Sequence, residues 1–109
     1  MKIKLEACVE SYKEGKRAEE LGANRIELCD NLAQGGTTPS YGTILQCKKD
    51  INIDINVIIR PRGGNFVYSK EELNIMKNDI IYNDRQDHQI QNPVFADVLA
   101  QPSSILLLS

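Results

Sequence analysis

At 109 residues the chain is long enough for one ordinary domain, and its 41% hydrophobic and 26% charged residues are typical of a folded protein rather than a disordered one. Its formal net charge is only −2, which gives no electrostatic reason to expect a nucleic acid or a membrane surface as partner. With 6% aromatic residues and no tryptophan, platforms for stacking nucleic-acid bases are also not expected.

The sequence lacks the features of an export signal or a membrane span. Residues 1–9 alternate charged and apolar side chains, whereas a secretory signal needs a continuous apolar stretch. The apolar run of residues 105–108 is far too short to cross a bilayer. The three cysteines, an odd number, favour reduced thiols over a disulfide framework. We therefore expect a cytoplasmic protein.

The first strand–helix unit is predicted at the start of the chain. Residues 3–9 alternate apolar and polar side chains, which is typical of a strand. Ser11 stands three residues before Glu14, a capping box that predicts the start of a helix. Gly22 is suited to follow the last turn of that helix, because glycine adopts a left-handed backbone easily.

A second unit follows directly. Residues 25–29 predict a strand, and a loop containing Gly35-Gly36 comes after it. Thr38 is expected to cap the next helix, with Pro39 as its first residue. This unit therefore repeats the strand–loop–helix order of the first.

The third unit has the plainest pattern. Residues 53–59 are rich in β-branched side chains, as in a strand buried on both faces. Ser69 and Glu72 form another capping box. The helix predicted after it repeats apolar residues at three- and four-residue spacing: Leu73, Met76 and Ile80.

Three consecutive strand–helix units require parallel strands joined by right-handed crossovers, in either a doubly wound open sheet or a (β/α)₈ barrel. In each strand the polar residues stand two positions apart, and because side chains alternate between the two faces of a sheet, they lie on the same face. An open sheet covered on both faces has little room for them, whereas a barrel opens into a mouth lined by strand ends. These polar residues are Glu6 and Cys8, Glu27 and Cys29, and Arg60 and Arg62.

The first loop also lacks the G-x-G-x-x-G pattern of dinucleotide-binding folds. We therefore predict an α/β fold, a truncated TIM (β/α)₈ barrel of about three βα units with a parallel sheet. A complete barrel takes roughly 250 residues, so about five of its eight units are expected to be absent.

Four segments in the same order resemble the CutC-type copper homeostasis family. They are LEACVES at 5–11, RIELC with NLAQGG within 25–36, TPSYG at 38–42 and IRPRGGNFVYS at 59–69. Glu10 stands where the family more often has aspartate, which keeps the carboxylate. The resemblance covers residues 1 to about 82 and implies a TIM barrel linked to copper handling. Residues 83–109 carry no family signature, and we expect them to be an irregular or frameshifted tail.

Cys8 and Cys29 are the candidate metal ligands. Both follow a glutamate in the pattern Glu-x-Cys on neighbouring strands, so two thiols of the same parity are expected close together. A thiolate pair is a soft ligand set that selects Cu(I), and these positions match the candidate ligands that the family resemblance implies. The alternative is that each cysteine packs as a small hydrophobic residue.

Arg60 and Arg62, followed by Gly63 and Gly64, form a candidate anion-binding site. A guanidinium pair beside a glycine-rich turn can hold phosphate or carboxylate. The sequence leaves open whether such a site serves an enzyme acting on a small anionic substrate.

Glu6 and Glu27 are candidate carboxylates of the barrel mouth, where they could act as acid or base beside a bound anion. The alternative is that Glu6, Glu27 and Arg60 neutralise one another, because buried charges need partners.

Three functions thus remain open: Cu(I) binding in copper homeostasis, catalysis on an anionic substrate, and a non-functional fragment. The missing units would leave the outer sides of the first and third strands unpaired. The isolated chain is then expected to be poorly soluble, molten, or a homo-oligomer joined through its open edges.

Overall fold

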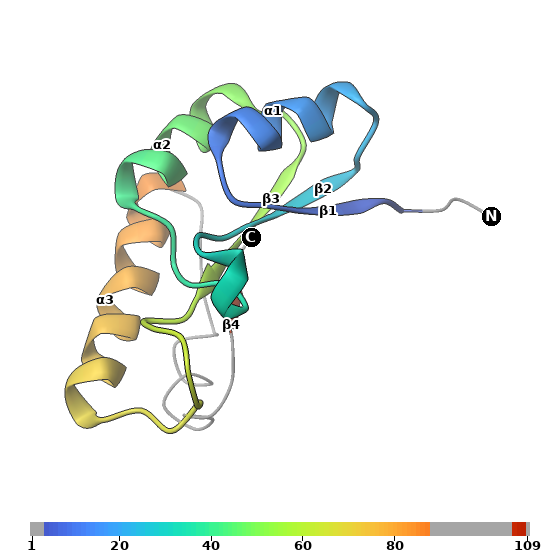
Figure 1. The fold of residues 1–109 in the computed structure, drawn as a ribbon. Helices are drawn as coiled ribbons and strands as arrows, with labels where there is room; N and C mark the ends of the chain where they lie inside the picture. Colours follow the sequence, from blue (N-terminus) through green and yellow to red (C-terminus); the bar gives the residue numbers. More distant parts are fainter. Residues whose placement is uncertain (1–3, 88–105, 109) are drawn as a thin grey trace.

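The computed structural model describes residues 4–87 and 106–108 (Figure 1). The three predicted strand–helix units are present. Their elements are β1 (Glu6–Val9), α1 (Tyr12–Glu20), β2 (Arg25–Leu28), α2 (Tyr41–Asp50), β3 (Asp54–Ile59) and α3 (Lys70–Asp87). A short 3₁₀ turn, η1 (Leu32–Gln34), lies between β2 and α2, and a further strand, β4 (Leu106–Leu108), follows.

Two of the three helices begin where the sequence predicts. The Ser11 hydroxyl accepts a hydrogen bond from the backbone N–H of Glu14 at 3.1 Å, and so begins α1. At α3 the capping box is reciprocal: the Glu72 N–H donates to Ser69 Oγ at 3.1 Å, and the Ser69 N–H donates to Glu72 Oε1 at 2.9 Å. Each cap satisfies backbone donors that have no partner inside the helix.

The predicted start of α2 is wrong by two residues. Ser40, not Thr38, caps this helix by accepting from the Thr43 N–H at 3.1 Å. The Thr38 hydroxyl instead accepts from the Arg60 N–H at 2.8 Å and donates to the Arg60 carbonyl at 3.2 Å. Thr38 therefore ties the loop before α2 to the end of β3, and the next hydroxyl along the chain takes over the cap.

The three N-terminal strands form a parallel sheet in the order β1-β2-β3, as predicted. Cys8 is the register partner of Glu27, which in turn lies beside Asn56 on β3. Alternate residues of each strand therefore make two distinct faces, one with Cys8 and Glu27 and the other with Val9 and Leu28.

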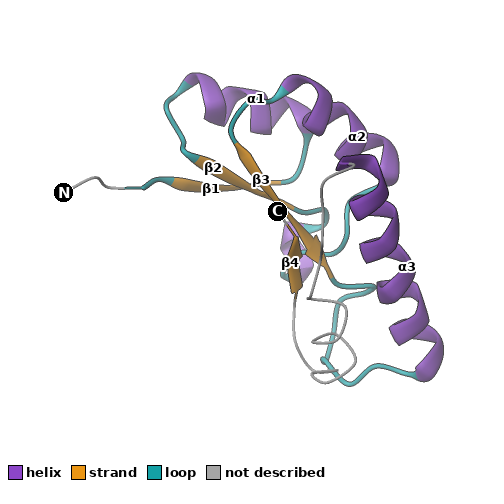
Figure 2. Cartoon of the chain, turned by 180° about the vertical axis from the view of Figure 1, so that it is seen from behind, coloured by secondary structure: helices purple, strands orange, loops and turns teal. Residues whose placement is uncertain are grey.

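All three helices cover the same face of the sheet (Figure 2). The core lies between this face and the helices, because the strand residues that point there are apolar. Its strand residues are Val9, Ile26, Leu28, Ile55, Val57 and Ile59, and they pack against Ile44, Cys47, Met76 and Ile80 of the helices and against Ile51 and Tyr68, which flank them. None of the helices in the described residues combines the length and the hydrophobicity that a membrane span requires.

The structure differs from the expectation of an irregular tail after Tyr82. Helix α3 continues to Asp87, and β4 pairs antiparallel with β3, with Leu107 opposite Ile58. The outer edge of β3, predicted to be unpaired, is therefore covered by a segment from the predicted tail. Residues 88–105 and 109 of that tail lie outside the described residues.

Helix α3 provides a matched test of the core. Ile80 is 1% exposed in the core cluster, whereas Ile75 on the same helix is 50% exposed. We expect Ile80→Ala to lower the free energy of unfolding by about 2–5 kcal/mol, because it leaves a cavity in a close-packed core. Ile75→Ala removes the same atoms from the surface, and its effect in urea denaturation is expected to be small. Equal losses in the two variants would contradict the assignment of the core.

The pairing of β4 with β3 predicts that β4 protects the chain from aggregation. Removing residues 106–109 frees the apolar edge of β3, and exposed edges template aggregation. We therefore expect this deletion to increase light scattering and to shift the chain to larger species in size-exclusion chromatography. Removing Ser109 alone is the control, and unchanged behaviour of both deletions would show that β4 does not protect the edge.

Candidate functional site

The face of the sheet away from the helices carries the polar residues that the sequence pattern placed there. Glu6 and Cys8 lie on this face of β1, and Glu27 lies beside Cys8 on β2. Cys29 follows β2 directly, two residues beyond Glu27, so it shares the same face.

The two candidate ligand thiols lie close together. Cys8 Sγ is 3.8 Å from Cys29 Sγ, as the shared parity predicts. Cys8 is exposed, whereas Cys29 is 1% exposed and its thiol donates a weak hydrogen bond to the Val9 carbonyl at 3.5 Å. The pair therefore has one thiol open to solvent and one held inside the protein.

The environment of Cys29 keeps it protonated. Burial, followed by the hydrogen bond with Cys8 and the nearby negative groups Glu27 and Glu10, raises the pKa of the Cys29 thiol to about 12. Because a metal binds the thiolate, a metal must displace this proton when it binds.

The loop after β2 packs directly against the buried thiol. A Cβ on Gly36 would lie 3.7 Å from Cys29 Sγ and 3.2 Å from Ile58 Cδ1. Gly36 also has a φ of +95°, a conformation that other residues rarely adopt. The second glycine of the Gly35-Gly36 pair is thus required by its backbone conformation and by its tight approach to Ile58, whereas its distance to Cys29 is an ordinary van der Waals contact.

Arg60 holds this loop in place. Its guanidinium Nη1 donates to the Gln34 carbonyl at 2.6 Å and to the Gly36 carbonyl at 2.9 Å. Nη2 donates to the Gly64 carbonyl at 2.9 Å, and the group lies 4.9 Å above the Phe66 ring. Arg60 is 3% exposed, so these carbonyls replace the hydration lost by its two terminal nitrogens, whereas Nε is buried without a partner.

Arg62 is also engaged by its own loop. It forms an ion pair with Glu72, and it donates to the carbonyls of Asn65 and Val67 at 2.8 Å each. Its guanidinium lies 5.2 Å from the centre of the Tyr68 ring. Most of its donors are therefore taken by the protein.

The two arginines do surround the predicted Gly63-Gly64 turn. Arg60 binds the Gly64 carbonyl, and Arg62 Nη1 donates to the Gly63 carbonyl at 3.1 Å. Most of their hydrogen-bond donors bind backbone carbonyls and thereby shape the loops. Anion binding by the two arginines stays a prediction.

The carboxylates of the predicted barrel mouth have a partner that the sequence analysis missed. Arg25, the register partner of Glu6, forms an ion pair with Glu6, in the place that the neutralisation alternative gave to Arg60. Burial, then the hydrogen bond and charge of Glu6, raises the pKa of Glu27. Strand register places Arg25, at the start of β2, opposite Glu6, and this position could have predicted the ion pair from the sequence.

A cavity of about 740 Å³ opens beside the ends of β1 and β2, and the sequence analysis did not predict it. Among the side chains that line it are three acidic ones, Glu10, Glu14 and Asp30. Each accepts a backbone N–H: Glu10 that of Leu32 at 3.0 Å, Glu14 that of Glu10 at 2.9 Å and Asp30 that of Asn31 at 2.8 Å. Of the three, Glu10 lies close enough to the thiol pair for its charge to act on Cys29.

Within residues 4–87 and 106–108, no group of three or more His, Cys, Asp or Glu side chains is arranged to hold a metal ion. A metal at this site would therefore depend on the two sulfur atoms of Cys8 and Cys29, without a carboxylate or imidazole cage.

Fold and site together define a class of protein: parallel βα units of the TIM-barrel type, with a pair of thiols on the face that lines a barrel. A sequence model of the CutC family matches residues 3–103, and the chain belongs to this family. The match extends beyond Tyr82, where the sequence analysis placed the end of the resemblance. It confirms the family that the four sequence segments indicated.

Known relatives agree with this membership. The human protein described as copper homeostasis protein cutC homolog is 50% identical over 76 residues, or 70% of this chain and 28% of that protein. A CutC family protein of Chromobacterium violaceum is 50% identical over 76 residues, or 31% of its length. The chain thus spans less than a third of these relatives.

The solved structure of a CutC protein from Streptococcus agalactiae has the same fold. It matches with a TM-score of 0.73 and 45% identity, over 79% of this chain and 42% of that one. The parallel βα units described above are therefore those of a TIM-barrel family, as predicted.

The ion pair between Arg62 and Glu72 predicts a pH dependence of stability. The hydrogen bond from Arg62, with that from the Ser69 N–H, lowers the pKa of Glu72 from its ordinary 4.5. A lowered folded-state pKa contributes stability that is present above the ordinary value and is lost as the pH falls through the lowered one.

We therefore expect Glu72→Gln to reduce the loss of thermal stability between pH 7 and the acidic side of 4.5, the ordinary pKa of Glu72. Glu71→Gln is the control, since Glu71 is exposed on the same turn and forms no ion pair within the described residues. Identical pH profiles for the wild type and Glu72→Gln would contradict this role.

Proposed function

We propose that this chain binds Cu(I) through Cys8 and Cys29 and acts in copper homeostasis, with copper as its cargo. The observation that carries the proposal is the 3.8 Å distance between the two sulfur atoms. A metal–sulfur bond is about 2.3 Å for zinc, so two sulfurs on one such metal can lie at most about 4.6 Å apart. The thiol pair needs little movement to share a metal ion.

The donor set fits Cu(I) better than a harder ion. Thiolates are soft ligands that select Cu(I), whereas carboxylate and carbonyl oxygens suit magnesium or calcium. Two thiolates can satisfy Cu(I), which accepts low coordination numbers. The carboxylates of Glu27 and Glu10, whose charges act on Cys29, raise the local concentration of cations at the pair.

The alternative is that Cys8 and Cys29 only pack as small hydrophobic residues. That role describes the third cysteine, Cys47, better. Cys47 is fully buried in the core cluster, as expected of a packing residue. Cys8 is exposed and lies against Cys29 instead of in the core, so packing alone does not account for it.

The relatives give the proposal its biological direction. The human and mouse proteins are both described as copper homeostasis protein cutC homologs. Reduced thiols suit a cytoplasmic location, which we propose for this chain. An enzyme acting on a small anionic substrate remains the alternative, favoured by the raised pKa of Glu27 but weakened by the carbonyls that occupy Arg60 and Arg62.

The test is Cu(I) binding by the full chain under anaerobic, reducing conditions, in competition with a chromogenic Cu(I) chelator. We expect one Cu(I) per chain for the wild type, and affinity at least tenfold weaker for Cys8→Ser and Cys29→Ser, because each removes one of two ligands. Cys47→Ala is the matched control and is expected to bind like the wild type.

Two results would overturn the proposal. One is wild-type affinity in the double variant Cys8→Ser, Cys29→Ser, which would place copper elsewhere. The other is a wild-type chain that folds, by circular dichroism, but does not compete for Cu(I). That second result would favour the anionic-substrate alternative or a chain without activity.

A further inference from the structure

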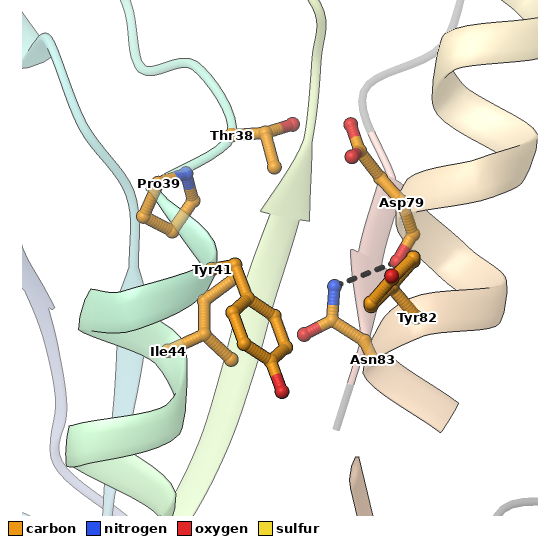
Figure 3. Close-up of a pocket in the computed structure, with 7 residues that line it drawn as sticks. All are labelled: Thr38, Pro39, Tyr41, Ile44, Asp79, Tyr82 and Asn83. Carbon is orange, nitrogen blue, oxygen red and sulfur yellow. Dashed lines mark hydrogen bonds between the residues drawn. The ribbon is translucent and has the colours of Figure 1, made fainter. Parts of the chain in front are cut away.

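A second cavity lies between α2 and α3 (Figure 3). These helices cover the face of the sheet opposite the one that carries the thiol pair (Figure 2). Its volume is about 410 Å³, which is within the range of small-molecule sites. Pro39 and Ile44 form part of its largely apolar wall. Neither the core nor the candidate metal site explains why this space is left open.

Two tyrosines stand at this cavity, one from each helix. The rings of Tyr41 and Tyr82 meet edge to face, with centroids 5.5 Å apart and planes at 79°. Tyr41 is 45% exposed and Tyr82 is 55% exposed, so much of each ring remains available to a ligand. The face of an aromatic ring carries partial negative charge and attracts cations.

Asp79 places a carboxylate at the same cavity, where its side chain points from α3 toward the segment of Thr38 (Figure 3). Within the described part of the chain, this carboxylate has no hydrogen bond or ion pair. Burial raises the pKa of Asp79, as expected for a partly buried charge without a compensating partner. The Thr38 hydroxyl cannot compensate it easily, because it is already bonded to the backbone of Arg60.

Asn83 provides a further acceptor. It is 4% exposed, and its Nδ2 donates to the Asp79 carbonyl at 2.8 Å. This bond fixes the amide and leaves its oxygen, Oδ1, toward the cavity (Figure 3). Asp79 and Asn83 therefore offer the cavity two hydrogen-bond acceptors, one of them negatively charged.

We infer that this cavity binds a small organic ammonium ion, that is, a protonated primary amine carried on an apolar or aromatic group. The ammonium group would donate to Asp79 and Asn83, and the apolar part would pack against Tyr41 and Tyr82. An anionic ligand would be repelled by Asp79. A bare metal ion would find only one carboxylate, too few ligands for a hard cation.

The test uses benzylamine and its neutral analogue benzyl alcohol, added to the full 109-residue chain and followed by NMR or calorimetry. We expect benzylamine to bind and benzyl alcohol to bind at least tenfold more weakly. Asp79→Asn keeps the shape of the side chain and is expected to weaken benzylamine binding by roughly tenfold or more, the value of a charge-assisted hydrogen bond. Glu71→Gln removes a charge from the same helix and should leave binding unchanged.

A second variant separates a fold defect from loss of the site. Tyr82→Leu keeps apolar bulk but removes the ring, and it should weaken benzylamine binding while leaving the folded circular dichroism spectrum intact. The inference is overturned if benzylamine does not bind the folded wild type, if benzyl alcohol binds equally well, or if Asp79→Asn binds like the wild type. The Cu(I) experiment is independent, because Cys8 and Cys29 lie on the other face of the sheet.

Discussion

The buried guanidinium of Arg60 holds together the part of the structure on which the candidate metal site depends. A cation that is 3% exposed must recover its lost hydration from protein acceptors. It does so from three carbonyls on two different loops, those of Gln34, Gly36 and Gly64. The planar fork of arginine suits this geometry, whereas the single ammonium group of lysine does not. The loop that covers Cys29 therefore takes its position from the residue after β3.

This dependence explains which features could be predicted from the sequence. The approach of Cys8 and Cys29 follows from alternation along two neighbouring strands, a local pattern, and the structure has it. The helix caps at Ser11 and Ser69 are equally local, and both hydroxyls accept the expected backbone N–H. Thr38 was misassigned because its hydroxyl bonds to the backbone of Arg60, a contact between residues distant in sequence.

Arg60 and Arg62 likewise make contacts that the sequence could not predict. A guanidinium beside glycines predicts an anion site when its partners are unknown, but carbonyl groups are present at every residue and leave no signal in the sequence. Only the fold reveals that Arg60 binds carbonyls of the loop after β2 and that Arg62 binds carbonyls of its own loop. Strand β4 was missed for a related reason: three leucines carry no alternation, and what decides their structure is the open edge of β3. The ion pair of Arg25 with Glu6, by contrast, could have been found from strand register.

The register also bears on whether the thiol pair can stay reduced and ready for a metal. Cys8 lies opposite Glu27, and Cys29 is two residues further along, so the two cysteines are offset along the sheet. Two residues of strand cover about 6.6 Å and neighbouring strands lie about 4.8 Å apart, which places the two Cα atoms about 8 Å apart. A disulfide needs Cα atoms within about 7 Å, so it could not form without movement of the backbone. A bridging metal tolerates a longer span, because each of its two bonds to sulfur is about as long as a whole disulfide bond. The offset that keeps the thiols from joining each other is thus compatible with their joining through a metal ion.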